Sequence, residues 1–201
     1  MSKVAAEQPS WREARRAAAR QTIIEAAWSL VGDEGFGGLA MRDLARRAGV
    51  TPPTLYAYFD SKHAILDAMF AQGQLEFAAR RSSGRPDEPM ATLRWFAETF
   101  VSFCTENPVR YQLLYQRPVP GFVPSDASYA LAARNLEPTR RCLAAVGLAE
   151  EAHLDVWTAL WAGVVAQQIA NEPGGTRWTR HVDTVLDMYL DHYLKPTKRR
   201  R

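Results

Sequence analysis

The chain has 201 residues, 47% of them hydrophobic and 23% charged, which is the composition of an ordinary soluble globular protein of one or two domains. It holds no apolar run of about 18 residues, and its N-terminus lacks the apolar core of a secretory signal. We therefore expect neither a membrane span nor a secretory signal, and we expect a cytoplasmic location. The net charge of +3 excludes little, because five of the basic residues lie in the last seven positions.

The first predicted element is a long amphipathic helix, from Trp11 to about Gly32. Ser10 and Glu13 have the spacing of a capping box at its start, and apolar residues then recur at helical spacing. Three arginines four residues apart, Arg12, Arg16 and Arg20, form one basic stripe along it.

Residues 41–48 predict a second, short helix, because Met41, Leu44, Ala45 and Ala48 fall on one face. Gly49 follows directly. The residue after a helix end often needs a positive φ, which glycine adopts at little cost. A tight turn is therefore expected here.

A third helix follows the turn. Thr51 is a suitable N-cap and Pro52 then occupies the first helical position, where its missing N–H costs nothing. Leu55 and Phe59 can face inward, which leaves hydroxyl and aromatic groups outside, with Arg42 nearby. This arrangement is typical of a helix-turn-helix whose second helix enters the major groove of DNA.

The stretch from Gly35 to Leu66 resembles the DNA-binding domain of the TetR family of bacterial repressors. The matching residues are Gly35-Phe36, Arg42-Asp43-Leu44-Ala45, Ala48-Gly49-Val50, Thr54-Leu55-Tyr56, Tyr58-Phe59, Ser61-Lys62 and Leu66. The sequence departs from the family where Leu39 and Ala40 replace the usual Ser or Thr. Because Ala40 cannot cap a helix, we expect a loss of about 1 kcal/mol of local helix stability.

The remaining chain predicts six further helices, at about residues 63–80, 90–106, 109–116, 126–146, 150–171 and 176–194. Residues 81–89, RSSGRPDEP, have the composition of a linker and mark a domain boundary. Residues 106–125 and Trp161-Ala162-Gly163 resemble the C-terminal domain of a TetR subgroup that carries a Trp-His-Gly motif, with Ala162 where histidine is usual.

Together the two resemblances imply an all-α fold. Residues 12–60 would form a three-helix helix-turn-helix DNA-binding head, and residues 61–80 a connecting helix. Residues 86–194 would form a helical ligand-binding and dimerisation domain. Residues 1–10 and 195–201 are expected to be disordered tails, the latter either solvated or weakly attracted to DNA.

The resemblance and the exposed helix positions together give candidate DNA contacts. Candidates for base edges or thymine methyl groups are Thr51, Pro52, Pro53, Thr54 and Tyr58, and candidates for phosphates are Thr22, Arg42, Tyr56 and Lys62. Residues 52–59 hold no Arg, Lys, Asn or Gln, so bidentate readout of G or A from this helix is excluded. Specificity would then rest on apolar and hydroxyl contacts, on DNA shape, and on Arg46, Arg47 or the N-terminal arm. The arginine stripe is either such a contact or a solvated face.

Large apolar residues are unusually frequent in the second domain. The resemblance implies that a small molecule of unknown identity binds between its helices; as candidates we name Trp95, Phe96, Phe100, Phe103, Tyr111, Leu114, Tyr115, Phe122, Trp157, Trp161 and Gln167. Aromatic residues at helical spacing are more often plain core, and that alternative stays open. Cys104 and Cys142 are expected to be free thiols in apolar surroundings.

The last two predicted helices have apolar faces broad enough to pack inward and outward at once. The resemblance implies a homodimer through a four-helix bundle; the candidate interface residues are Leu160, Val164, Gln168, Val182, Val185, Leu186 and Tyr189. A two-fold dimer would present two recognition helices to a palindromic operator in double-stranded DNA.

These features predict a DNA-binding transcriptional regulator, expected to be a repressor that a ligand releases from its operator. The alternative is a ligand-binding or protein-interaction module with only non-specific DNA affinity. No catalytic or metal-binding motif is found in the sequence, since GxSxG, P-loop, HExxH and CxxC patterns are all missing. No enzyme activity, cofactor, metal or membrane partner is therefore expected.

Overall fold

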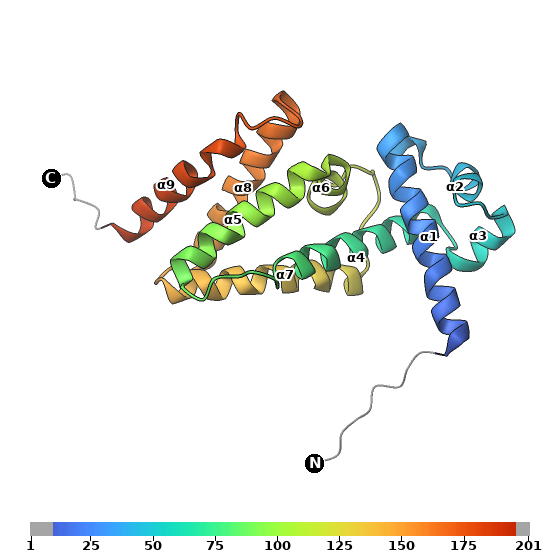
Figure 1. Ribbon diagram of the computed structural model, residues 1–201, viewed down its shortest axis with the longest axis horizontal. Helices are drawn as coiled ribbons and strands as arrows, with labels where there is room; N and C mark the ends of the chain where they lie inside the picture. Colours follow the sequence, from blue (N-terminus) through green and yellow to red (C-terminus); the bar gives the residue numbers. More distant parts are fainter. Residues whose placement is uncertain (1–9, 196–201) are drawn as a thin grey trace, which may run out of the picture. The chain divides into compact units, whose positions relative to one another are not determined.

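The computed structural model describes residues 10–195 (Figure 1), and in that range every regular element is a helix. The chain forms two compact units. The first reaches Met69 and includes residues 118–123; the second comprises residues 70–117 and 124 onward. The division falls within one helix, whereas the composition placed a linker at residues 81–89. The predicted tails lie almost wholly outside the described residues.

The first unit holds helices α1 (Trp11–Glu34), α2 (Met41–Arg47) and α3 (Pro52–Tyr58), with a short 3₁₀ turn, η1 (Phe36–Gly38), and the start of α4 (Lys62–Arg80). The capping box at the start of α1 is confirmed: Ser10 accepts from the Glu13 N–H, and Glu13 accepts from the Ser10 N–H at 2.7 Å. A small apolar core joins the four helices, and its innermost side chains are Ile23, Leu30, Leu44, Leu55, Phe59, Ile65 and Leu66.

The turn between α2 and α3 forms as predicted. Gly49 has φ +68°, a conformation that side chains with a Cβ rarely adopt. Thr51 is the N-cap of α3, its hydroxyl accepting from the Thr54 N–H, and Pro52 occupies the first helical position. Leu55 and Phe59 are buried, so one side of α3 is fixed against the core and the other side is left outside.

The N-terminus of α2 lacks a side-chain cap, as the sequence predicts. Ala40 has the extended backbone of an N-cap, with φ −105° and ψ 139°, but no group that accepts a hydrogen bond. Ala40→Ser should therefore raise the free energy of unfolding by about 1 kcal/mol, measured by urea denaturation. Ala18→Ser, at an exposed position inside α1, is the matched control and should be neutral or slightly destabilising. Equal effects of the two changes would contradict the capping argument.

The second unit is built around helix α5 (Pro89–Glu106), which packs against α6 (Pro108–Tyr115), α7 (Asp126–Ala145), α8 (Glu151–Asn171) and α9 (Val182–Leu194). The end of α4 completes it. Leu93, Phe96, Ala97, Val101 and Cys104 line the buried side of α5 at helical spacing. None of the helices in residues 10–195 is sufficiently long and apolar to cross a lipid bilayer.

The last helix begins later than predicted, at Val182 instead of about Thr176, after a 3₁₀ turn at Thr179–His181. The reason lies in the preceding helix. The side-chain oxygen of Gln168 accepts the backbone N–H groups of Trp178, at 2.8 Å, and Thr179, at 3.3 Å. These bonds hold the segment in a turn, an arrangement that local sequence patterns do not reveal.

Candidate functional site

The start of α3 presents a continuous exposed surface. Thr51, Pro52, Pro53 and Thr54 all face solvent, and the hydroxyl oxygens of Thr51 and Thr54 lie 2.8 Å apart. The surface thus offers two hydroxyls and two proline rings. Such groups can contact thymine methyls and single hydrogen-bonding atoms of base edges, but they cannot make the bidentate bonds that distinguish G or A.

The end of α3 is tied to α1 by Arg20. Its guanidinium donates to the backbone carbonyl of Tyr58 at 2.6 Å and lies over the ring of Phe59, 4.1 Å from its centre. Carbonyls in the last turn of a helix have no partner within the helix, and a cation there also interacts favourably with the helix dipole. Arg20 therefore positions α3, a role that neither of the sequence interpretations included.

The other predicted contacts surround α3. Tyr56 is 53% exposed and Arg42 is also exposed, while Tyr58 and Lys62 are half-buried. The Lys62 ammonium donates to the carbonyl of Phe36 at 2.9 Å, which leaves two of its three N–H groups for another acceptor.

The remaining candidates lie on α1 and α2. Thr22 is exposed, and its hydroxyl donates to the Ala18 carbonyl. Arg47 is paired with Asp33 at 2.5 Å, so its charge is already balanced by a carboxylate of the same unit. Arg46 pairs with Asp43 at 2.8 Å in a largely exposed position, where an ion pair is weak and easily exchanged.

The residues predicted for a ligand site do not all lie together. Buried in the second unit are Phe96, Phe103, Tyr111, Leu114, Trp157 and Trp161, and Trp95 and Phe100 are half-buried there. Phe122 instead belongs to the first unit, where its ring packs against His63. Gln167 is exposed and its side chain accepts from Asn171, so the side chain that reaches the interior is that of its neighbour Gln168.

The aromatic residues of the second unit form two clusters. Phe77 contacts Phe100 and Phe103, and Phe100 contacts Tyr115, with ring centres 5.0–5.9 Å apart; Tyr115 is 37% exposed. The other cluster contains Trp157, Trp161 and Tyr189. The Tyr111 hydroxyl donates to the backbone carbonyl of Ala162, within the Trp-Ala-Gly segment. Phe77 and Tyr189 extend the predicted aromatic set.

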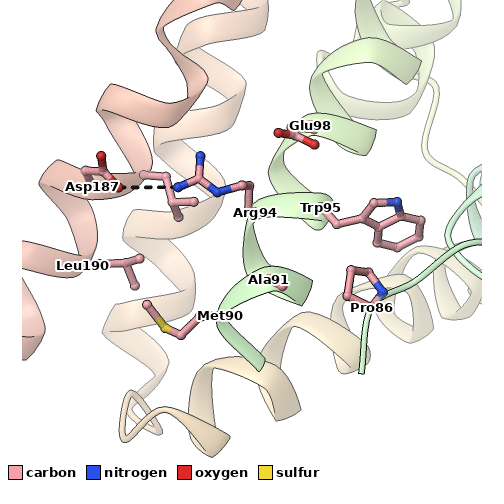
Figure 2. A pocket seen from close by; sticks show the side chains of 9 residues that line it. Pro86, Met90, Ala91, Arg94, Trp95, Glu98, Asp187 and Leu190 are labelled. Carbon is pink, nitrogen blue, oxygen red and sulfur yellow. Dashed lines mark ion pairs between the residues drawn. The ribbon is translucent and has the colours of Figure 1, made fainter. Parts of the chain in front are cut away.

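A cavity of about 420 Å³ opens between α5 and α9, as Figure 2 shows. Its walls are formed by Pro86, Met90, Ala91, Arg94, Trp95, Glu98, Leu186, Asp187 and Leu190. Arg94 spans it from α5 to form ion pairs with Asp183 and, at 3.7 Å, with Asp187 on α9. Only Trp95 of the predicted ligand residues lines this cavity.

Four of the residues predicted for a dimer interface are buried within a single chain: Gln168, Val182, Leu186 and Tyr189. A buried side chain offers no surface to a partner. Leu160, Val164 and Val185 are half-buried and can still contribute. Two exposed apolar residues lie at helical spacing from Leu160 and Val185: Val156 on α8 and Met188 on α9, the latter 67% exposed.

Both cysteines are free thiols, Cys104 buried and Cys142 partly so. Burial raises the pKa of each thiol above its ordinary value. Since the thiolate is the reactive form, both behave as small apolar side chains, which confirms the prediction of two unpaired cysteines.

Comparison with known proteins agrees with this geometry. The chain shares 41% identity over 69 residues with the tetracycline repressor protein class C of Escherichia coli, which covers 34% of this chain and 31% of that one. The chain therefore matches only about a third of that relative's length.

Two solved structures have the same fold. FadR from Bacillus subtilis, in complex with stearoyl-CoA, has a TM-score of 0.64 at 16% identity and covers 84% of this chain and 96% of its own. TetR-Q116A from Acinetobacter baumannii, in complex with minocycline, has a TM-score of 0.60 at 22% identity and covers 86% of this chain and 94% of its own.

Two family matches cover most of the chain. Residues 23–69 match the family described as bacterial regulatory proteins, tetR family, and residues 93–193 match the tetracyclin repressor-like C-terminal domain. The first match contains the helix-turn-helix of α2 and α3. The second contains α6 to α8 whole, α5 from Leu93 onward and α9 except its last residue. The chain thus belongs to the tetR family of DNA-binding transcriptional regulators, which are not enzymes.

Proposed function

We propose that this regulator is a repressor, which binds a palindromic operator as a homodimer and leaves it when a small molecule binds the second unit. The observation that carries the proposal is the exposed start of α3, with Thr51 to Thr54 outside and Leu55 and Phe59 anchored in the core. A recognition helix held rigidly by its scaffold can read base edges through its N-terminal residues.

In this proposal base contacts and phosphate contacts are made by different residues. Thr51, Pro52, Pro53, Thr54 and Tyr58 face base edges and thymine methyls, so the operator should be rich in A·T pairs at these positions. Phosphate contacts come from Thr22, Arg42, Tyr56 and Lys62, which fix the register without reading sequence.

The phosphate assignment of Tyr56 predicts a uniform effect. Tyr56→Phe removes only the hydroxyl of an exposed side chain. It should weaken binding to operator and to random duplex by the same factor, at least about tenfold, as expected for one hydrogen bond to a charged phosphate. Fluorescence anisotropy at two salt concentrations measures it, and the salt slope should not change because no charge is lost. A loss confined to the operator would instead make Tyr56 a base contact.

We propose that the dimer forms through the outer face of α8 and α9. This face comprises Val156, Leu160 and Val164 of α8 with Val185 and Met188 of α9, whose side chains are all at least partly exposed. Ala159 and Gly163, which are exposed between them on α8, would let two helices approach closely. A two-fold interface then sets the distance between the two recognition helices.

The effector would bind in the aromatic interior of the second unit. Two proteins of the same fold were solved with a small molecule bound, stearoyl-CoA in one and minocycline in the other. By analogy the ligand here would favour a conformation of the dimer in which the two heads no longer match the operator spacing. Release then follows from its differential affinity for that conformation.

The alternative is a module that binds DNA without sequence preference. It is favoured by one observation, the lack of amide or guanidinium groups on α3. Near physiological salt, the affinity of a specific repressor for its best duplex should exceed its affinity for random duplex by about 10³-fold or more. A ratio near one would support the alternative.

A further inference from the structure

A buried arginine lies between α4 and α7 of the second unit. Arg81 is only 8% exposed, although the sequence places it in an apparent linker. Its guanidinium donates to the backbone carbonyl of Asn135 and, at 2.8 Å, to the hydroxyl of Thr139. Both acceptors are neutral, so these bonds do not compensate the charge.

No carboxylate within residues 10–195 pairs with Arg81. Two arginines nearby each pair with a carboxylate: Arg110 with Glu76 at 3.0 Å, and Arg80 with Glu106 at 2.5 Å. Burial lowers the pKa of Arg81 to about 10, so the group still carries its proton at neutral pH. A buried charge is costly unless an opposite charge accompanies it.

Two hydrogen-bond donors of this cluster have no partner among residues 10–195. One is the Nε–H of Arg81 and the other is the side-chain NH₂ of Gln74, a residue only 1% exposed. The two belong to one network, because Asn135 donates to the side-chain oxygen of Gln74 at 2.8 Å while its carbonyl accepts from Arg81. Unpaired buried donors are rare and call for an acceptor.

The surroundings of the cluster are apolar and aromatic. The Arg81 guanidinium lies 3.9 Å from the ring centre of Phe96 and 5.2 Å from that of Phe77, and Phe77 continues into the cluster with Phe100 and Tyr115. Its planar face is therefore covered by rings, whereas its edge carries the free Nε–H. The edge of a guanidinium is where a carboxylate binds with two parallel hydrogen bonds.

We propose that Arg81 and Gln74 form the anion-binding part of the effector site, and that the effector is a carboxylate with an apolar alkyl or aryl body. This inference rests on the proposed release by a small molecule and names its chemical class. The ligand's carboxylate would supply the missing counter-charge and accept from the two free donors. The aromatic cluster of Phe77, Phe96 and Phe100 would hold the apolar body.

The test compares acids with their neutral counterparts on the full chain. Isothermal titration calorimetry at neutral pH would use the straight-chain alkanoates from acetate to palmitate and phenylacetate, each beside its amide. We expect at least one acid to bind and its amide to bind at least about 30-fold more weakly, the effect of losing a buried charge pair. If every acid fails to bind, or the amides bind as tightly, the proposal is overturned.

Three variants locate the site. Arg81→Met should weaken binding of the acid at least about 30-fold, and Arg81→Lys should weaken it too, because lysine keeps the charge but loses the planar fork. Arg80→Met is the matched control: it removes the neighbouring arginine, which is already paired with Glu106, and should leave binding unchanged. If Arg81→Met fails to fold, the Arg81→Lys comparison decides. Unchanged acid affinity in the folded Arg81 variants would contradict the assignment.

A DNA-binding assay with the same acid separates this inference from the proposed function. Acid binding through Arg81 with unchanged DNA affinity would support the anion site and contradict ligand release. Release of DNA by a neutral compound, with equal potency against Arg81→Met, would support ligand release and overturn the anion site.

Discussion

Met188→Glu is expected to convert the protein from dimers to monomers and to lower its affinity for a palindromic duplex by about 10²–10⁴-fold. Met188 is 67% exposed on α9, so the change should cost the single chain little. In a two-fold interface the glutamate would appear twice, and each carboxylate would be buried without a partner. Analytical ultracentrifugation measures the mass, and anisotropy measures the affinity.

The matched control for Met188→Glu is Tyr129→Glu, which places the same charge at a 65% exposed apolar residue of α7. It should change neither mass nor DNA affinity. Affinity of Met188→Glu for a duplex with one half-site should also stay near the wild-type value, because each head is intact. A Met188→Glu protein that remains a dimer would place the interface elsewhere.

Arg20→Ala should lower the free energy of unfolding by about 1.5–3 kcal/mol, the range for a hydrogen bond from a charged donor. It should also weaken operator binding at least about tenfold, which corresponds to a loss of about 1.4 kcal/mol of binding free energy. The reason is positional. Arg20 donates to the last carbonyl of α3, on Tyr58, and covers the ring of Phe59. Without Arg20 the C-terminal end of the recognition helix loses its contact with α1.

The salt dependence of binding distinguishes this role from a phosphate contact. If Arg20 only positions α3, Arg20→Ala leaves the slope of log affinity against log salt unchanged. A lost phosphate contact reduces that slope by about one. Arg16→Ala, one turn earlier on α1 and exposed, is the control and should not destabilise the protein. A reduced slope for Arg20→Ala with unchanged stability would contradict the positional role.

Features that depend on neighbouring residues could be predicted from the sequence. The positive φ of Gly49, the Thr51 cap, Pro52 at the first position of α3 and the uncapped Ala40 all follow from local backbone chemistry. The helix boundaries were predicted to within about two residues, as expected for strong periodic patterns, with the last helix as the exception.

Features that join distant segments could not be predicted in this way. The bond from Arg20 to Tyr58 spans 38 positions, and a basic stripe on α1 gives no sign of it. Gln168 lies on the buried face of α8, seven residues after Trp161, but the spacing does not show that its side chain accepts the backbone N–H groups of Trp178 and Thr179. Arg81 stands in a linker-like run but is among the most buried charged residues in the described chain.

Aromatic content does not show which of these residues share one region of the fold. Phe122 shares the composition of its neighbours in sequence, but it packs in the first unit. The two polar residues of the proposed anion site, Gln74 and Arg81, carry no sequence signal, because their donors become buried without a partner only in the folded interior.

The central claim, that a two-fold dimer reads a palindrome through the start of α3, is tested most directly by selecting random duplex DNA on the full-length protein near physiological salt. The account predicts an enriched palindrome whose half-sites lie one helical turn of about 34 Å apart, or a multiple of it. Salt-sensitive binding to every duplex, with no sequence enriched, would contradict this claim. The protein would then bind the DNA backbone without sequence preference.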